Sequence, residues 1–199
     1  MTTPVILASS SASRVRLLTA AGVPFTTEPA HVDEEAIKQS LRAEGATAGA
    51  CAETLAEIKA VTISQRHRHA LVIGADQMLE CGGTWFDKPA DLGRAEEQLL
   101  ALAGKTHTLP TAAVVALGGT RIWHHVATPR LCMRSFDRAF VQGYLAGVGK
   151  AALPSVGAYQ LEGLGSQLFH TVEGDFFTIL GLPLLPLLAF LRAHHVVPS

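Results

Sequence analysis

The sequence predicts an α/β fold in which a mixed sheet is flanked by helices. Short apolar runs typical of buried strands, at residues 5–8 and 71–75, alternate with longer segments of helical periodicity. Hydrophobic residues make up 48% of the 199 residues and charged residues 17%, so the chain can bury a large core and is not expected to be disordered. We expect a single domain over residues 1–199.

The N-terminal part begins with a strand, a polar turn and a helix. Val5–Ala8 is an apolar run followed by serines, and the helix that comes next is expected to end at Gly22. Residues 32–64 have helical character, and Gly45 and Gly49 suggest a break between two helices. Leu71–Ala75 predicts a second buried strand.

The C-terminal part continues the alternation of helices and strands. Its expected elements are a helix over Asp91–Leu102, a hairpin of Ala112–Leu117 with Arg121–Thr128, a helix capped by Ser135, a strand over Phe176–Leu180 and a helix from Pro183.

The charge and the cysteines exclude several classes of protein. The formal net charge is −1, so we expect no general attraction for nucleic acid or for an anionic membrane, and a polyanion must be held by a local cluster of groups. The three cysteines are widely separated, which indicates buried free thiols in a reducing compartment. The most apolar stretch, Ile179–Leu191, is too short and too interrupted for a membrane helix, and the first residues do not resemble a signal peptide. We therefore expect a cytoplasmic protein.

The turn Ser9–Arg16 is the first candidate for a site. A helix that follows directly on a strand leaves N–H groups unpaired at its start, which favours an anion there. Serine hydroxyls and the guanidinium of Arg14 could hold phosphate oxygens. The alternative is an ordinary helix cap made by Ser11 or Ser13, with Arg14 and Arg16 on a solvated face.

Charged residues elsewhere are also open to two interpretations. Asp76 at the end of a buried strand could orient a water or bind a divalent ion, or it could be a turn residue that bonds its own backbone. Lys59 and Lys88 could be phosphate cations or solvated lysines. The acidic group Asp33–Glu35 could supply a metal ligand or open the helix that follows. The nine histidines show no metal-binding spacing, and we expect them at the surface.

Taken in order, seven segments of the chain resemble the Maf family of proteins. They are ILASSSASR at Ile6–Arg14, VDE at Val32–Glu34, KA at Lys59–Ala60, IGAD at Ile73–Asp76, DKP at Asp87–Pro89, GAYQLEGLG at Gly157–Gly165 and EGDFFTILGLPL at Glu173–Leu184. Each segment is weak alone, but the ordered set spans nearly the whole chain.

The resemblance implies a nucleoside triphosphate pyrophosphatase, which hydrolyses an NTP to the monophosphate and pyrophosphate with a divalent cation, Mg²⁺ or Mn²⁺. It also implies two lobes around a nucleotide cleft and a homodimer. The family's motifs fall on residues with three implied roles in this sequence: Asp76, Lys59 and Lys88 for catalysis, Glu34 and Asp76 for the metal, and Ser9, Ser11, Ser13, Arg14, Arg16, Gln77, Gln160 and Glu162 for the substrate.

Two departures from the family's pattern affect the expected activity. Ser13 stands where an arginine is usual, so one phosphate cation is missing unless Arg16 folds back to replace it. Gln77 and Glu162 resemble the branch of the family that acts on 7-methyl-GTP, which favours a purine or modified purine. The alternative function is a catalytically weak nucleotide-binding regulator linked to cell division, and the missing arginine is what suggests it.

Overall fold

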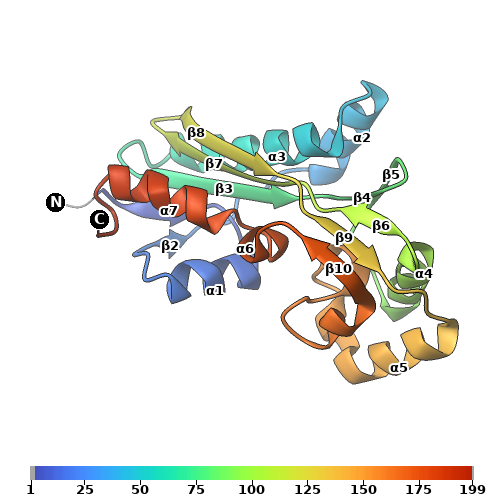
Figure 1. Cartoon of the computed structure of the whole chain (residues 1–199). Coiled ribbons are helices and arrows are strands. Elements are labelled where there is room, and N and C mark those ends of the chain that lie inside the picture. The colour runs from blue at the N-terminus through green and yellow to red at the C-terminus, as the bar shows by residue number, and fades with distance from the viewer. Residues whose placement is uncertain (1–2, 199) are drawn as a thin grey trace. The chain divides into compact units, whose positions relative to one another are not determined.

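The computed structural model describes residues 3–198 and shows two compact units, each built on its own sheet (Figure 1). Of the described residues, the first unit comprises 3–77, Thr111–Ala127 and 175–198. The second comprises Met78–Pro110 and Thr128–Gly174. Both sheets are flanked by helices, so the predicted α/β class is confirmed.

The sheet of the first unit is mixed, as predicted. Its strands lie in the order β2-β1-β3-β7-β8 and cover Val5–Leu7 (β1), Thr26–Thr27 (β2), Leu71–Gln77 (β3), Thr111–Leu117 (β7) and Thr120–Ala127 (β8). β1 runs parallel to β2 and β3, while β7 runs antiparallel to β3 and β8. Leu7 pairs with Ile73, so the residues that follow β1 lie at the same edge of the sheet as the end of β3.

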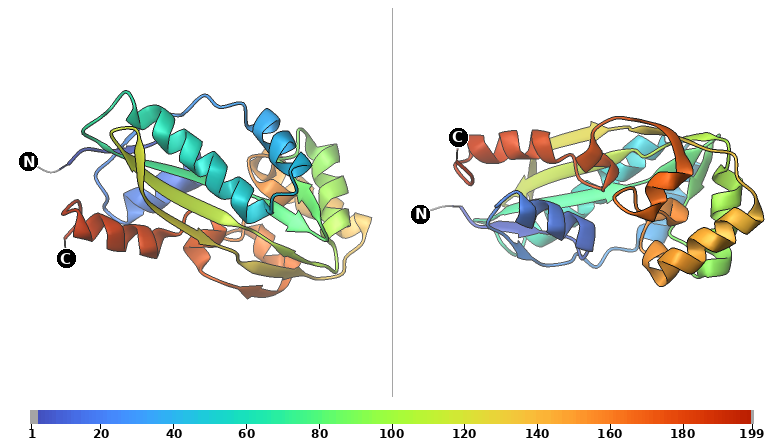
Figure 2. Two further views of the ribbon diagram at one scale, coloured as in Figure 1. Left: turned by 90° about the horizontal axis from the view of Figure 1, so that it is seen from above. Right: turned by 60° about the horizontal axis from the view of Figure 1, so that its bottom comes forward.

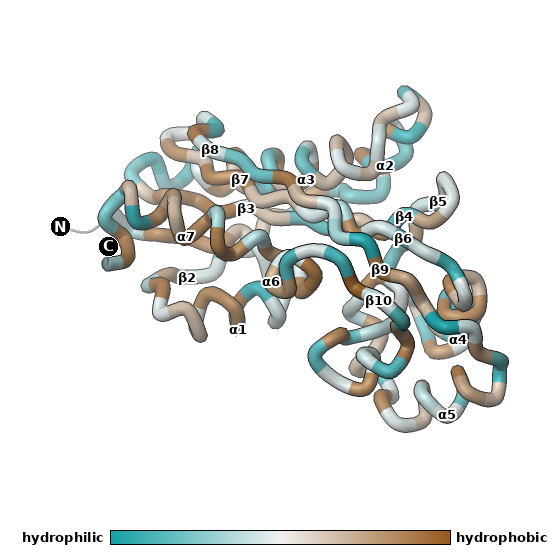
Figure 3. The backbone as a smooth tube through the Cα atoms, in the orientation of Figure 1, coloured by the Kyte–Doolittle hydropathy of each residue, from teal (hydrophilic) through white to brown (hydrophobic). Residues whose placement is uncertain are grey.

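Helices cover both faces of this sheet. They are α1 (Ala12–Ala20), α2 (Glu34–Ala43), α3 (Ala48–Ser64), α6 (Phe176–Ile179) and α7 (Leu184–Ala193). α3 lies on one face, and α1 and α7 lie on the other (Figures 1 and 2). The residues of β3 alternate between these faces: Ile73 packs in the core that contains Leu187 of α7, while Val72 packs with Ile63 of α3. Figure 3 shows the apolar character of much of β3 and α7.

Two predictions about the first unit are confirmed and one is wrong. The break between α2 and α3 is confirmed, as is the hairpin of β7 and β8. The strand predicted over residues 176–180 is wrong, because this segment forms the short helix α6. Asp175 decides this conformation, since its carboxylate accepts from the backbone N–H and the hydroxyl of Thr178.

The second unit contains an antiparallel sheet that the sequence analysis did not find. The strands lie in the order β10-β9-β6-β4-β5 and cover Leu79–Cys81 (β4), Thr84–Phe86 (β5), Thr106–Thr108 (β6), Arg130–Met133 (β9) and Phe169–Glu173 (β10). The helices are α4 (Leu92–Leu102) and α5 (Arg138–Val148), followed by the 3-10 turns Gly149–Ala152, Val156–Ala158 and Leu164–Leu168. Strands of three to five residues are too short to show a periodicity of two. The expected cap at Ser135 is also wrong, since Asp137 caps α5 through a bond from the N–H of Phe140.

One histidine contradicts the expectation of a surface position. His107 on β6 is only 1% exposed, and its Nε2 lies 2.7 Å from the hydroxyl of Tyr159. Burial lowers the pKa of His107 to about 4, so the ring is neutral at physiological pH.

The cysteines are free thiols, as predicted, but only one of them is buried. Cys51 is buried, whereas Cys81 and Cys132 are half-buried, so the expectation of burial is wrong for these two. Among residues 3–198, no helix is long and apolar enough to cross a membrane.

Candidate functional site

A buried lysine joins two carboxylates in the first unit. Lys59 Nζ of α3 lies 2.5 Å from Asp76 Oδ1 at the end of β3 and 2.7 Å from Glu34 Oε1 at the start of α2. The side chains of Lys59 and Asp76 are each 8% exposed, and that of Glu34 is 44% exposed. The interpretations of Lys59 as a solvated lysine and of Asp76 as a turn residue are therefore wrong. The three residues form one charged cluster with an open side at Glu34.

A glycine on β3 allows α3 to come close enough for this contact. Gly74 and Asp76 point to the same face of the sheet, because side chains alternate along a strand. A Cβ at Gly74 would lie 2.1 Å from the carbonyl oxygen of Ala56 and 2.8 Å from the backbone nitrogen of Ala60. Any larger residue would push α3 away, so Gly74 determines the reach of Lys59 toward Asp76.

The residues of the acidic group at the start of α2 make three different contacts, and one of them opens the helix as predicted. Asp33 is the N-cap and accepts a hydrogen bond from the N–H of Ala36 at 3.1 Å. Glu34, the first residue of the helix, reaches the ammonium of Lys59 instead. The neighbouring Glu35 accepts from Gln39 on the exposed side of the helix. Only Glu34 of this group therefore joins the cluster.

The turn Ser9–Arg16 leads into α1, which begins at Ala12, and no serine hydroxyl caps this helix. Ser11 is the N-cap residue, but its side chain makes no capping hydrogen bond. Ser9 is 8% exposed, and its Oγ accepts from the N–H of Ser11 and from Nη1 of Arg14, both at 3.2 Å. The side-chain cap proposed for this turn is thus absent at Ser11, and the start of α1 keeps the N–H character that attracts anions.

Arg14 is held in a fixed orientation by two contacts. Its Nε donates to the carbonyl oxygen of Gly181 at 2.9 Å, and its Nη1 donates to Ser9. Burial lowers the pKa of the Arg14 guanidinium, whereas the negative charges of Asp76 and Glu34 act to raise the pKa. The group stays charged, because a guanidinium does not lose its proton in proteins. Arg14 therefore does not lie on a solvated face, and it belongs to the same electrostatic environment as the Lys59 cluster.

Arg16 lies one helical turn beyond Ser13 and turns back toward it. Its Nη2 is 3.4 Å from Ser13 Oγ, and the contact is exposed to solvent. The cation of Arg16 therefore lies beside Ser13, the position at which the resemblance implies an arginine.

The remaining predicted residues lie in the second unit, except for Gln77. Lys88 and Glu162 are exposed, and Gln160 donates to the carbonyl oxygen of Ala151 at 3.2 Å. The first unit thus brings together Glu34, Lys59 and Asp76 in one cluster and Ser9 with Arg14 in a second, while Lys88, Gln160 and Glu162 belong to the other unit.

Gln77 ends β3 and contacts residues that the sequence analysis did not select. Its Nε2 lies 2.8 Å from Thr111 Oγ1 and 3.1 Å from the carbonyl oxygens of Thr178 and Ile179. The segment Glu173–Leu184 was one of the matching motifs, but no residue type within it points to a role for a backbone carbonyl.

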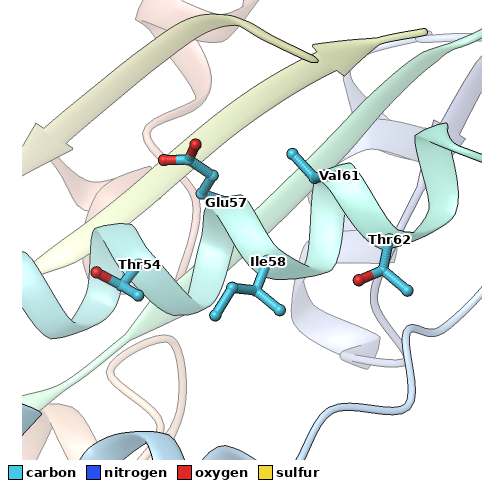
Figure 4. Close-up of a pocket in the computed structure, with 5 residues that line it drawn as sticks. All are labelled: Thr54, Glu57, Ile58, Val61 and Thr62. Atoms are coloured by element: carbon cyan, nitrogen blue, oxygen red, sulfur yellow. The ribbon is translucent and has the colours of Figure 1, made fainter. Parts of the chain in front are cut away.

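A surface pocket on α3 contains none of the predicted site residues. It is lined by Thr54, Glu57, Ile58, Val61 and Thr62, which all project from α3 (Figure 4). Binding sites usually collect groups from several elements, so this pocket is not a candidate for the nucleotide.

The fold and the charged clusters define an α/β protein with cations and helix N–H groups collected at the ends of two parallel strands. Such an edge is where open α/β sheets bind ligands, and the groups present suit an anion. The model of the Maf-like protein family matches residues 4–194. The chain belongs to this family, as the ordered motifs indicated.

Relatives of the chain carry two different names. A "Nucleoside triphosphate pyrophosphatase" from Paramagnetospirillum magneticum is 59% identical, over 94% of this chain and 96% of the relative. A protein with the same name from Granulibacter bethesdensis is 53% identical, over 97% and 98% of the two chains. A "7-methyl-GTP pyrophosphatase" from Brucella abortus is 48% identical, over 96% of each chain.

Proposed function

We propose that this protein hydrolyses a nucleoside triphosphate to the monophosphate and pyrophosphate. The observation that carries the proposal is the buried Lys59 ammonium between Asp76 and Glu34, in the same electrostatic environment as Arg14. A triphosphate carries several negative charges, and a chain with a net charge of −1 must balance them locally. The names of the relatives support the same reaction.

The residues of the first unit divide the reaction between binding and proton transfer. Arg14 and the N–H groups at the start of α1 bind phosphate oxygens. The oxygen of a water forms a bond to the α-phosphorus, and the bond from that phosphorus to the oxygen bridging to the β-phosphate breaks. Asp76 accepts the proton of the water, and the electron pair of the broken bond leaves with pyrophosphate. Lys59 holds Asp76 through Oδ1 and so fixes the orientation of its carboxylate.

The carboxylates of the cluster fit the divalent cation that the family implies. Mg²⁺ is usually bound by one or two carboxylates together with phosphate oxygens and waters, and not by a cage of protein ligands. Glu34 and Asp76 direct oxygens at one shared position, now held by the ammonium of Lys59. No group of three or more metal-binding side chains exists among residues 3–198, which agrees with a site completed by the substrate. The cation, Mg²⁺ or Mn²⁺, would neutralise charge on the phosphates.

Two further cations complete the proposed set. Arg16 replaces the arginine missing at Ser13, because its guanidinium reaches that position. Lys88 and the polar residues Gln160 and Glu162 of the second unit are proposed to contact the substrate on the family resemblance alone.

The base is proposed to be a purine or a modified purine. A glutamate such as Glu162 accepts hydrogen bonds from the N1–H and amino group of a guanine, whereas a pyrimidine edge suits a glutamine. Four relatives that are 48–50% identical carry the name "7-methyl-GTP pyrophosphatase". GTP and 7-methyl-GTP are therefore the substrates to test first.

A nucleotide panel with detection of pyrophosphate tests the reaction. Purified protein with Mg²⁺ or Mn²⁺ should release pyrophosphate from a purine triphosphate, and Asp76→Asn should reduce the rate by at least about a hundredfold because the proton acceptor is lost. Glu57→Gln on α3, the helix that carries Lys59, is the matched control and should keep the wild-type rate. Release of orthophosphate alone, or full activity of Asp76→Asn, would refute this mechanism. Binding of nucleotide without any turnover would favour the alternative function, a catalytically weak nucleotide-binding regulator.

A further inference from the structure

The amide nitrogen of Gln77 is committed to contacts within the protein. Nε2 lies against Thr111 Oγ1 and the carbonyl oxygens of Thr178 and Ile179, at 2.8 to 3.1 Å. Backbone carbonyls only accept hydrogen bonds, so the amide must present its NH₂ group to them. The two N–H donors of the amide are shared among three acceptors, which leaves no donor for a base.

Gln77 and Asp76 also face opposite sides of the sheet. Asp76 points to the α3 face, where Lys59 contacts it. Gln77, the next residue along β3, points to the other face and reaches α6. Asp76 and Gln77 are adjacent in the sequence, but they contact helices on opposite faces of the sheet.

The segment held by Gln77 is a single helical turn with a buried contact. α6 has four residues, and Gln77 binds the carbonyls of its last two residues. Thr178 is 2% exposed and Thr111 is fully buried, so water cannot replace the amide easily. Without Gln77, the carbonyl of Ile179 would lose this partner and the end of α6 would move.

The end of α6 leads directly to the contact that orients Arg14. Gly181 follows two residues after Ile179, and its carbonyl oxygen accepts from Arg14 Nε at 2.9 Å. Gly181 has a φ of 104°, a conformation that favours glycine, so its carbonyl direction depends on a special backbone geometry. Ser9 fixes the other side of the guanidinium.

We propose that Gln77 is a positioning residue for the triphosphate: it fixes the end of α6, and through the carbonyl of Gly181 it fixes the guanidinium of Arg14. The inference rests on the proposed function, in which Arg14 binds phosphate. It differs from the role implied by the resemblance, because the effect of Gln77 passes through the phosphates and is independent of the base.

A ligand without a base tests the proposal. Gln77→Met keeps the length of the side chain and removes both donors, and inorganic tripolyphosphate with Mg²⁺ is the probe for binding by calorimetry. We expect the Kd for tripolyphosphate to rise about tenfold, because a hydrogen bond to a charged group loses its alignment. The KM for GTP, 7-methyl-GTP, dTTP and UTP should rise by the same factor. Gln65→Met, the same change at an exposed helix end, is the control and should leave both values unchanged.

A double-mutant cycle with Arg14 tests the route of the effect. In an Arg14→Gln background, Gln77→Met should change the Kd for tripolyphosphate by less than about twofold, because the group that it positions is gone. An undiminished tenfold effect in that background would overturn the proposal, as would a KM increase confined to one base with an unchanged Kd for tripolyphosphate.

Failure of the role of Gln77 and failure of the proposed hydrolysis would give different results in these measurements. If Gln77→Met fails to fold, Thr111→Val, which removes the hydroxyl between Gln77 and α6, must weaken tripolyphosphate binding in the same way or the proposal fails. A wild-type protein that binds tripolyphosphate but releases no pyrophosphate would refute the hydrolysis and leave the effect of Gln77 measurable. A wild-type protein that does not bind tripolyphosphate would overturn the inference.

Discussion

Replacing Gly74 by alanine tests whether the close packing of α3 on β3 holds the charged cluster together. The new Cβ would lie 2.1 Å from the carbonyl oxygen of Ala56 and 2.9 Å from the Cβ of Ala60. Backbone atoms cannot rotate away from such a contact, so the whole helix must move. Normal contact distances are about 3.5 Å, which requires a displacement on the order of 1 Å. Lys59 precedes Ala60 on this helix, so its distance to Asp76 must lengthen.

The displacement predicts losses in both stability and activity. Overpacking of a core costs about 1–3 kcal/mol, and the direct conflict with backbone atoms places Gly74→Ala at about 3 kcal/mol. A shift of about 1 Å in a catalytic group lowers a rate by up to about a hundredfold. We therefore expect the rate of pyrophosphate release to fall between about tenfold and a hundredfold, with a smaller change in KM.

Urea unfolding and steady-state kinetics measure the two effects. Gly143→Ala in α5 is the matched control, since a Cβ there meets no atom within 4 Å. That variant should be stabilised by up to about 1 kcal/mol, because alanine is the better helix former, and it should keep its activity. A Gly74→Ala protein with the wild-type urea midpoint and wild-type kinetics would refute the reasoning about α3.

Three further predictions concern other residues of the structure. Burial lowers the pKa of His107 to about 4, whereas an exposed histidine in the unfolded chain has a pKa of about 6.5. Below about pH 6.5 the unfolded chain therefore binds more protons than the folded protein, and about 3 kcal/mol of folding free energy should be lost as the pH falls from 6.5 to 4. Urea unfolding across this range should show a flatter dependence for His107→Gln, and an equal slope in both proteins would contradict the burial argument. Lys59→Met should lower the free energy of unfolding by about 3 kcal/mol, because it leaves the buried Asp76 carboxylate without its ammonium partner. The double variant Lys59→Met/Asp76→Asn should recover most of that loss in urea unfolding, whereas additive losses would argue against an interaction between the two residues. Arg16→Gln should raise the KM for every nucleotide about tenfold, and Ser13→Arg in that background should restore it, whereas an unchanged KM would exclude Arg16 as the replacement cation.

The apolar runs and helical segments of the first unit were predictable because each has a clear local pattern. β3 has seven residues, of which six are buried, and α3 has seventeen residues, which is long enough for its helical character to show. The sheet of the second unit was missed, since its strands are short and their pairing joins residues far apart in the sequence, such as Phe169 with Met133. Local pattern carries little information about such pairs.

Capping residues account for the smaller errors. Asp137 and Asp175 begin α5 and α6, and neither was selected from the sequence. Asp137 lies two residues after Ser135, which has a similar capping preference, and only the backbone conformation decides which side chain accepts the helix N–H. The strand expected over residues 176–180 is wrong because its apolar residues suit a strand or a buried helical turn equally well, and the cap at Asp175 makes the segment helical.

The sequence by itself determined the α/β class, the family, and the residue types of the candidate site. Residue types and their spacing are properties of the chain alone, so the sequence was sufficient to select Ser9, Arg14, Glu34, Lys59 and Asp76. Only the tertiary structure decided which of these groups meet. Lys59 contacts Asp76 because Gly74 lets α3 approach the strand, and Gln77 turns away from Asp76 because side chains alternate along β3. These relations depend on packing between elements, which no local pattern in the sequence records.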